Sequence, residues 1–377
     1  MTTATALARA SPLTVMYVDL NTEWRGGQRQ ILWMAEGLRR RGGRPLLALR
    51  PNAVLAERAS ARGIEVVPIN PLFAEWGPWT VMRLRRLAAR EGVQILHPQC
   101  GHSMALSALA ALGTDTRVIF ARRVTSRLRP GVVTRIKYRR AHRIIAVCRA
   151  AVPALVDVGI DPELVDVVYS GVDLQRLVEP ATRDTLETLG VPAGAPLVVM
   201  VGALVPMKDP LTFVRAIAAA RAQSPNLHAV LLGDGPLRLT VESLVRELAL
   251  GAVFHLAGFR TDADSLMRAA DVVVLSSDGS AEGIGGVVID AISFGRPVAA
   301  TAAGGVPEVI ENERTGLLVP VGDGAALGAA IARLLTDHRL AARLSAAGLA
   351  RAADFSVERT IDGTIAAYER LLTTRSS

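Results

Sequence analysis

The feature that most constrains this chain is a regular alternation of short apolar segments with amphipathic ones, which runs through most of its 377 residues. Segments such as 14–20, 44–50 and 142–148 have the length and apolar content of buried strands. The segments between them carry apolar residues at helical spacing. Strands that alternate with helices indicate parallel sheets covered on both faces. The alternation therefore predicts an α/β protein.

A polar stretch over 173–195 interrupts the alternation, which then restarts. Its composition is typical of a linker between domains. We therefore expect a first domain over 1–172, a linker over 173–195, a second domain over 196–354 and a final helix over about 355–377. Ligands of open α/β sheets bind at the carboxyl ends of the strands, so two facing domains predict an active site in the cleft between them.

Composition excludes several classes of protein. The two cysteines, Cys100 and Cys148, lie far apart, which argues against a disulfide scaffold and fits a reducing cytoplasm. Residues 1–13 lack a basic start and a sustained apolar stretch, so we expect a loose tail and no secretory signal. No apolar run approaches membrane-spanning length, and no group of Cys and His has metal-ligand spacing. We expect a cytoplasmic protein without a metal site.

Positive charge is concentrated in the first half. Residues 1–175 carry 25 Lys and Arg against 13 Asp and Glu, whereas residues 176–377 carry 18 against 22. A basic surface attracts nucleic acid, anionic lipid or phosphorylated substrates, although solvated helix faces in an arginine-rich chain give the same count. Aromatic residues are only 4% and no nucleic-acid-binding signature occurs, so we expect no nucleic acid partner. We predict peripheral contact with an anionic membrane, mainly through residues 122–149.

The most informative motif follows the apolar run 272–275. An acid, Glu282, precedes the glycine turn 283–286, and a second acid, Asp290, lies in the helical segment after the turn. A glycine turn at a helix N-terminus presents free backbone N–H groups to a phosphate. An acid beside such a site is expected to bind hydroxyl groups attached to the phosphate. A ligand that combines phosphate with several hydroxyl groups is a sugar nucleotide. Taken alone, the segment also fits an ordinary strand-to-helix connection.

Two further strand ends in the second half offer parts of a nucleotide site. Lys208 follows Gly202 and is one of only two lysines in the chain. It can reach a diphosphate as a point charge, or lie on the surface. Gly258, followed by Phe259 and Arg260, allows a planar base to approach the backbone, or simply ends a packed strand.

The first half contributes glycines, histidines and arginines at predicted strand ends. Gly26 and Gly27 lie between strand and helix without the GxGxxG pattern of a dinucleotide site, and they permit close approach of a ligand or of the opposing domain. A histidine at a strand end is more often structural than functional. Paired arginines there can hold a phosphate or carboxylate with two hydrogen bonds. These side chains are His97, His102, Arg122 and Arg123.

Together these motifs resemble those of retaining glycosyltransferases of family 4, which have the GT-B fold of two facing Rossmann-like domains. The match covers nearly the whole second half in order, and parts of the first half. It is carried by residues 200–216, 230–238, 254–259, 282–290, 293–323 and 167–173, with the glycine loop at 26–27 and residues 144–150. The resemblance implies the GT-B fold, with an interdomain cleft and a last helix that crosses back to the first domain.

The resemblance also implies roles for the matched residues. Glu282 is expected to contact the donor sugar, Asp290 the ribose and Lys208 the phosphate. The strand end at Gly202 lies on the donor side, and the first-half glycines match the loop beside the diphosphate and acceptor. The residues expected to meet the diphosphate through their backbone are Ile284, Gly285, Gly286 and Val287. Those expected on the base side are Gly258 and Phe259, with Arg260 beside them.

The chain departs from the family pattern at three places. The second acid is usually Glu and is Asp290 here, and an arginine that often follows the strand-end glycine is replaced by Ala203. Many members have a strand-end histidine near the reacting sugar. At the corresponding place this chain offers Arg122 or Arg123, with His102 as a substitute. We therefore take Glu282 and Lys208, with these three residues, as the predicted catalytic set.

The resemblance implies a cytoplasmic, metal-independent, retaining transferase. It would move a sugar from a UDP- or GDP-type donor to a glycan or lipid-linked acceptor, in cell-envelope polysaccharide or lipopolysaccharide synthesis. Front-face attack is expected, with the departing phosphate as base and no cofactor beyond the donor. Two alternatives remain open: a sugar-nucleotide epimerase of the same fold, and a non-catalytic nucleotide-binding protein.

Overall fold

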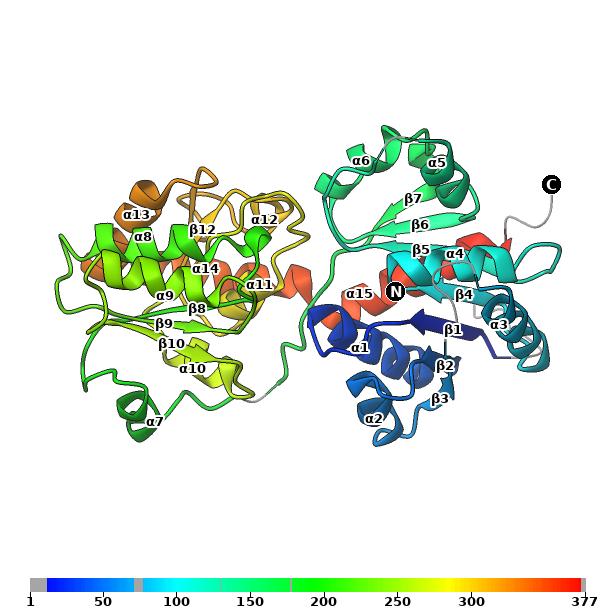
Figure 1. Cartoon of the computed structure of the whole chain (residues 1–377), viewed down its shortest axis with the longest axis horizontal. Coiled ribbons are helices and arrows are strands. Elements are labelled where there is room, and N and C mark those ends of the chain that lie inside the picture. The colour runs from blue at the N-terminus through cyan, green and yellow to red at the C-terminus, as the bar shows by residue number, and fades with distance from the viewer. Residues whose placement is uncertain (1–11, 71–76, 130, 177, 374–377) are drawn as a thin grey trace, which may run out of the picture.

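The computed structural model describes residues 12–70, 77–129, 131–176 and 178–373, and it contains one parallel sheet in each half of the chain (Figure 1). The predicted tail lies, up to residue 11, outside the described residues. The first sheet has the strand order β3-β2-β1-β4-β5-β6-β7. Its strands are β1 (Thr14–Asp19), β2 (Arg44–Leu49), β3 (Glu65–Pro68), β4 (Ile95–Pro98), β5 (Arg117–Arg122), β6 (Arg143–Ala146) and β7 (Val165–Val167).

Helices cover both faces of this first sheet. One apolar core joins the sheet to α1, α2 and the last helix, α15, and a second core joins the opposite face to α3, α4, α5 and α6. The bounds are α1 (Gly26–Arg40), α2 (Val54–Ser60), α3 (Pro78–Arg90), α4 (Gly101–Ala110), α5 (Val132–Tyr138), α6 (Pro153–Val156) and α15 (Val357–Thr373).

The second sheet has the order β10-β9-β8-β11-β12-β13 and is also covered on both faces. Its strands are β8 (Leu197–Val201), β9 (His228–Leu232), β10 (Phe254–Gly258), β11 (Val272–Leu275), β12 (Val298–Thr301) and β13 (Leu317–Val319). Its helices are α8 (Pro210–Ala220), α9 (Arg238–Glu247), α10 (Ala263–Ala269), α11 (Gly286–Ser293), α12 (Val306–Val309), α13 (Gly324–Thr336) and α14 (His338–Ala352). This is the predicted α/β architecture of two Rossmann-like domains.

Central strands are apolar on both sides because both faces of each sheet are buried. Along β8, Val198 and Met200 point into one core, whereas Leu197 and Val199 point into the other. Side chains alternate between the two faces of a strand, so a continuous apolar run is required to fill both cores. The short apolar runs in the sequence therefore identified these strands correctly.

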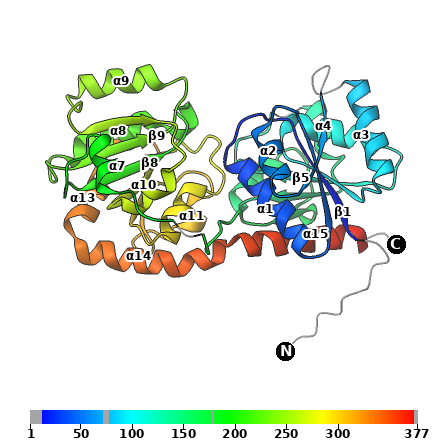
Figure 2. The same ribbon diagram turned by 90° about the horizontal axis from the view of Figure 1, so that it is seen from below.

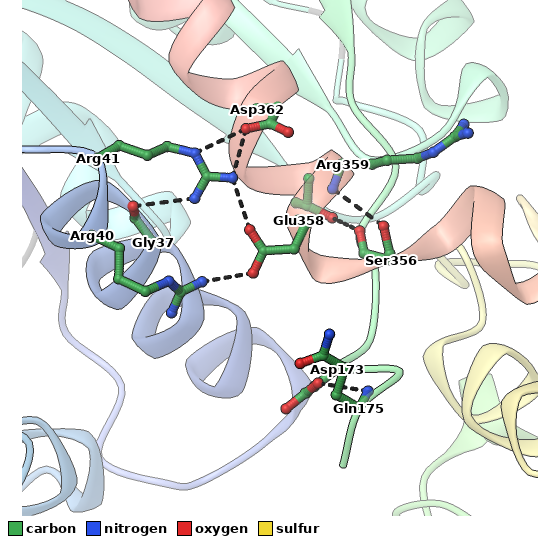
Figure 3. A network of polar contacts seen from close by, with 10 residues as sticks. Gly37, Arg40, Arg41, Asp173, Gln175, Ser356, Glu358, Arg359 and Asp362 are labelled. Atoms are coloured by element: carbon green, nitrogen blue, oxygen red, sulfur yellow. Dashed lines mark hydrogen bonds and ion pairs between the residues drawn. The ribbon is translucent and has the colours of Figure 1, made fainter.

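The chain returns to the first domain through α15, which lies along that domain in Figure 2 and contacts α1. Figure 3 shows the polar contacts at the rim of this packing. Arg40 Nη2 donates to Glu358 Oε1 at 2.7 Å, and Arg41 donates to both Glu358 and Asp362. These ion pairs are partly exposed, so the apolar contacts beneath them supply most of the binding between the two helices.

Two short helices were missed by the sequence analysis. One is α5, between β5 and β6. The other is α7 (Arg183–Thr188), inside the stretch 173–195 that we expected to be a linker. Thr182 caps α7 by accepting a hydrogen bond from the backbone of Thr185. Among the described residues, no helix is both long and apolar enough to cross a membrane.

Candidate active site

The candidate residues gather where the strand order of each sheet reverses direction. In the first sheet this point lies between β1 and β4, and in the second between β8 and β11. Gly26 and Gly27 follow β1, Gly202 and Lys208 follow β8, and Glu282 follows β11. Ligands of doubly wound sheets bind at these switch points, outside the carboxyl ends of the strands. The topology therefore groups the predicted site residues around both switch points.

Glu282 and Lys208 form an ion pair. Lys208 Nζ lies 2.5 Å from Glu282 Oε2, and Ser277 Oγ donates to the same oxygen at 2.5 Å. Glu282 is only 5% exposed. The aliphatic part of Lys208 lies against Gly202, where an added Cβ would be 3.6 Å from Lys208 Cγ. The structure thus brings together Glu282 and the strand end of Gly202 and Lys208, which the sequence analysis selected as two separate motifs.

The glycine turn after Glu282 begins helix α11. Gly285 has the left-handed backbone angle φ 71°, and an added Cβ there would lie 2.9 Å from Val306. At Gly286 an added Cβ would meet nothing within 4 Å, so the space in front of this helix end is open. Ile284 is buried in the apolar core, and Val287 packs against the same core. These contacts hold the turn in place on its buried side. Free N–H groups at such a helix end suit an anion.

The glycines of the first domain occupy a similar position at the start of α1. An added Cβ at Gly26 would meet nothing within 4 Å, and one at Gly27 would reach only Arg123 Cδ, at 4.0 Å. Internal packing therefore does not require glycine at either position. Because Gly26 and Gly27 have no side chains, the N-terminal end of α1 is accessible to a ligand.

The two domains touch beside Glu282. Thr125 Oγ1 donates to the backbone carbonyl of Glu282 at 2.7 Å. An added Cβ at Gly283 would lie 2.3 Å from the backbone oxygen of Arg123, so the two backbones approach too closely for any side chain. Glycine at 283 is therefore required by contact between the domains.

Glu308 makes a second contact between the domains that the sequence analysis missed. Its carboxylate accepts from the backbone of Arg149 at 2.9 Å, from Ala150 at 2.8 Å and from the Tyr169 hydroxyl at 3.0 Å. A carboxylate that accepts several hydrogen bonds anchors the loops that carry it. Only the position of Glu308 within the family-like segment 293–323 could have marked it in advance.

Asp290, expected at the ribose, binds two arginines. Its Oδ2 accepts from Arg29 Nη2 at 2.8 Å and its Oδ1 from Arg176 Nη2 at 2.9 Å. Arg176 also pairs with Asp264 at 3.0 Å. Burial, together with the nearby charge of Asp290, raises the pKa of Asp264 above its ordinary value. No sequence pattern marked Arg29 or Arg176, because a long-range ion pair leaves no local signature.

On the predicted base side, Gly258 ends β10 with φ 66° and accepts a backbone bond from Gly233 at 2.7 Å. Phe259 is exposed beside it. Arg260 is held by Asp262 through two hydrogen bonds of 2.8 and 2.7 Å. The exposed ring of Phe259 is therefore the side chain at this strand end that is available to a base.

Arg122 and Arg123, which we expected to act as a pair, have different partners in the structure. Successive residues at a strand end point to opposite faces. Arg122 is buried and donates to the backbone carbonyl of Ser126, whereas Arg123 donates to Gln99 Oε1 at 2.6 Å. Only Arg123 lies near the glycines at the start of α1. His102 is exposed in the first turn of α4.

His97 belongs to a buried polar group beneath this region. Its Nδ1 is hydrogen-bonded to the Tyr368 hydroxyl at 2.6 Å, and that hydroxyl lies 3.3 Å from the hydroxyl of Tyr17. Burial lowers the pKa of His97 to about 3, with a further contribution from the charge of Arg123. His97 is therefore neutral near pH 7 and joins α15 to β4, which is a structural role.

Within the described part of the chain, no group of three or more His, Cys, Asp or Glu side chains is arranged to hold a metal ion. Positive groups around the switch points include the side chains of Lys208 and Arg123 and the N-terminal ends of α1 and α11.

Two parallel-sheet domains that meet at their switch points define the GT-B class of folds. Residues 24–176 match the family model Glycosyltransferase Family 4, and residues 182–351 match the model Glycosyl transferases group 1. The chain belongs to this family, the GT-B glycosyltransferases of family 4.

Known proteins agree with this assignment. The chain is 32% identical to a D-inositol 3-phosphate glycosyltransferase of Saccharomonospora viridis over 56% of its length, and 34% identical to one of Mycobacterium bovis over 57%. These matches cover 51% and 45% of the relatives, so the chain spans about half the length of the curated relatives it matches.

Solved structures share the fold. A glycosyltransferase from Rickettsia africae superposes with a TM-score of 0.85 at 19% identity and covers 97% of this chain and all of its own. Anabaena HepE in complex with UDP and glucose superposes with a TM-score of 0.81 at 22% identity, covering 94% of this chain and 99% of its own.

The buried His97 makes stability depend on pH. Its folded pKa of about 3 lies below the value near 6.5 of an unfolded histidine, so its contribution is present above pH 6.5 and is lost as the pH falls toward 3. We predict that between pH 6 and 4 the unfolding free energy of the native protein falls more steeply than that of His97→Asn, by up to about 1.4 kcal/mol per pH unit.

Urea denaturation at several pH values measures both slopes. The slopes are compared and not the absolute stabilities, because the variant also loses the bond to Tyr368. Parallel slopes for the two proteins would show that His97 is not held neutral by burial.

Proposed function

We propose that this protein is a retaining glycosyltransferase that moves a sugar from a nucleotide-diphosphate donor to a glycan or lipid-linked acceptor. The observation that carries the proposal is the Lys208–Glu282 ion pair, which lies between two strand ends and beside the glycine turn of α11. An ammonium group, a carboxylate and free backbone N–H groups match the parts of a nucleotide sugar, which combines an anionic diphosphate with a polyol.

The proposed chemistry requires positive charge where the diphosphate leaves. Lys208 gives one of its three N–H donors to Glu282, which leaves donor capacity for a phosphate oxygen. The N-terminal ends of α1 and α11 add partial positive charge. Groups fixed in advance stabilise a leaving anion without reorganising during the reaction. We propose that these groups suffice and that transfer proceeds without a bound metal.

The proposed role of Glu282 is to orient the donor sugar. Both of its described hydrogen bonds go to Oε2, so Oε1 supplies acceptor capacity for sugar hydroxyl groups. In the proposed reaction the acceptor attacks from the face that the diphosphate leaves, and the departing phosphate takes the acceptor's proton. Arg123 and His102 remain candidates for the acceptor side, and Phe259 for the base.

The names of the similar proteins guide the choice of substrates. HepE was solved with UDP and glucose, which supports UDP-sugars as the first donors to test. The relatives named for D-inositol 3-phosphate support that compound as one acceptor in a screen, beside glycan and lipid-linked acceptors of the cell envelope. Turnover of a donor that requires an acceptor separates a transferase from an epimerase of the same fold.

A membrane-associated acceptor is supported by one face of the first domain. Residues 117–149 contain no acidic residue, and the exposed arginines on and beside α5 are Arg127, Arg129, Arg135, Arg139 and Arg140. Within this segment α5 exposes Val132 (74%), Val133 (66%) and Ile136 (53%), and α3, on the same side of the sheet, exposes Trp79 (71%). Exposed apolar side chains among basic ones match a bilayer with anionic lipids. We propose that this face binds the inner surface of the cytoplasmic membrane.

The site residues are expected to separate by kinetics. Lys208→Ala should weaken nucleoside-diphosphate binding by roughly 1.5–3 kcal/mol, the value of a lost charged hydrogen bond. Glu282→Gln should lower kcat while leaving the affinity for the nucleotide alone nearly unchanged, because that ligand lacks the sugar. Calorimetry measures the affinity for the nucleoside diphosphate, and steady-state kinetics measure kcat. The native enzyme should also keep its turnover in EDTA. Lys137→Ala, which changes the other lysine, is the matched control. Full activity of Glu282→Gln would contradict the assignment.

Membrane contact is tested by co-sedimentation with vesicles. The protein should bind phosphatidylcholine vesicles that contain phosphatidylglycerol, and salt should weaken binding because exposed charges are screened within about 8 Å at physiological ionic strength. Val132→Glu with Val133→Glu should reduce binding. Leu239→Glu, at a 77% exposed position on α9 of the other domain, should not. Equal binding to neutral and anionic vesicles, or no binding to either, would refute this part of the proposal.

A further inference from the structure

Four charged side chains from three parts of the chain form one cluster. Arg29 comes from α1 of the first domain, Arg176 from the segment between the domains, and Asp264 and Asp290 from α10 and α11 of the second domain. Arg29 and Arg176 bind different oxygens of Asp290, at 2.8 and 2.9 Å, and Arg176 also reaches Asp264 at 3.0 Å. The cluster therefore links both domains and their connection.

Aromatic rings hold both guanidinium groups in place. Arg29 lies over the ring of Trp33, 4.9 Å from its centroid, and Arg176 lies over Phe294 at 4.8 Å. The Asp290 side chain is only 4% exposed. Ion pairs that are buried and oriented in this way are stronger and less screened than exposed ones. The cluster can thus restrain the distance between the elements that carry it.

The elements that Arg29 and Asp290 join are the two helices with open glycine N-terminal ends. Arg29 lies three residues after Gly26, and Asp290 lies four residues after Gly286, so each is about one turn into its helix. The ion pair consequently connects α1 and α11, and with them the two domains, near the start of both helices. Together with the contacts at Gly283 and Glu308, it contributes to the separation of the two helix ends.

The contacts of Arg29 in the structure go to Asp290 and to the ring of Trp33. A carboxylate has about four lone-pair sites, and Asp290 uses two, so it retains capacity for ribose hydroxyl groups while both arginines stay bound. Arg29 can therefore act on a donor through the position of Asp290.

We propose that Arg29 is a positioning residue: through Asp290 it holds α1 and α11 in the relative position in which both of their N-terminal ends can face the nucleotide. Closure of the two domains and binding of the nucleotide are then coupled in part through this ion pair. The consequence for catalysis rests on the proposed function, whereas the restraint on domain closure does not.

The coupling is tested by a double-mutant cycle of Arg29→Met and Asp290→Asn, read out as the dissociation constant of UDP or GDP and as the donor KM. Arg29→Met should raise both by about tenfold, the order expected for one lost charged hydrogen bond, with a smaller change in kcat. The double variant should bind no more weakly than Asp290→Asn alone, because both changes break the same link. Arg40→Met, on the same helix, is the control and should bind normally. If the dissociation constant of the double variant rises by the product of the two single-variant factors, the proposal is overturned.

A second measurement does not depend on catalysis. Without nucleotide, small-angle X-ray scattering should give a larger radius of gyration for Arg29→Met than for the native protein or Arg40→Met. An unchanged radius in Arg29→Met would overturn the restraint. If no variant binds any nucleotide while the radius responds as expected, the proposed function fails and the restraint stands.

Discussion

The approach of two backbones at Gly283 is the constraint on which the rest of the site depends. The backbone oxygen of Arg123 occupies the place of a side chain at Gly283, and Thr125 binds the carbonyl of Glu282. This contact brings the loop that carries Glu282 against the carboxyl ends of the first sheet. Lys208, Glu282 and the open ends of α1 and α11 each follow a strand beside a switch point.

The sequence predicted those parts that depend on local patterns. Apolar runs identified the strands, because side chains on both faces of a parallel sheet must be buried. Lys208 was selected separately from Glu282 and its glycine turn, and the structure brings Lys208 and Glu282 within 2.5 Å of each other. Strand ends that neighbour each other in a sheet collect at one edge, so residues after β8 and β11 had to meet.

The parts that were missed depend on contacts between distant segments. The bonds of Arg29 and Arg176 to Asp290 span 261 and 114 residues, and Glu308 reaches Arg149 across 159. Nothing near any of these residues indicates its partner. Arg122 and Arg123 have different partners because neighbouring residues of an extended segment point to opposite faces. The short helix α5 was overlooked because three of its seven residues are exposed apolar side chains, which obscures the usual helical pattern.

The central claim is that one diphosphate is bound by the ends of both α1 and α11. Hydrogen–deuterium exchange of the backbone amides, with and without UDP or GDP, tests it most directly. We predict that the nucleotide that binds slows exchange at residues 26–28 and at residues 285–287 together, because both helix ends donate to the same ligand. Slower exchange at only one of these turns, or only elsewhere in the chain, would contradict the account.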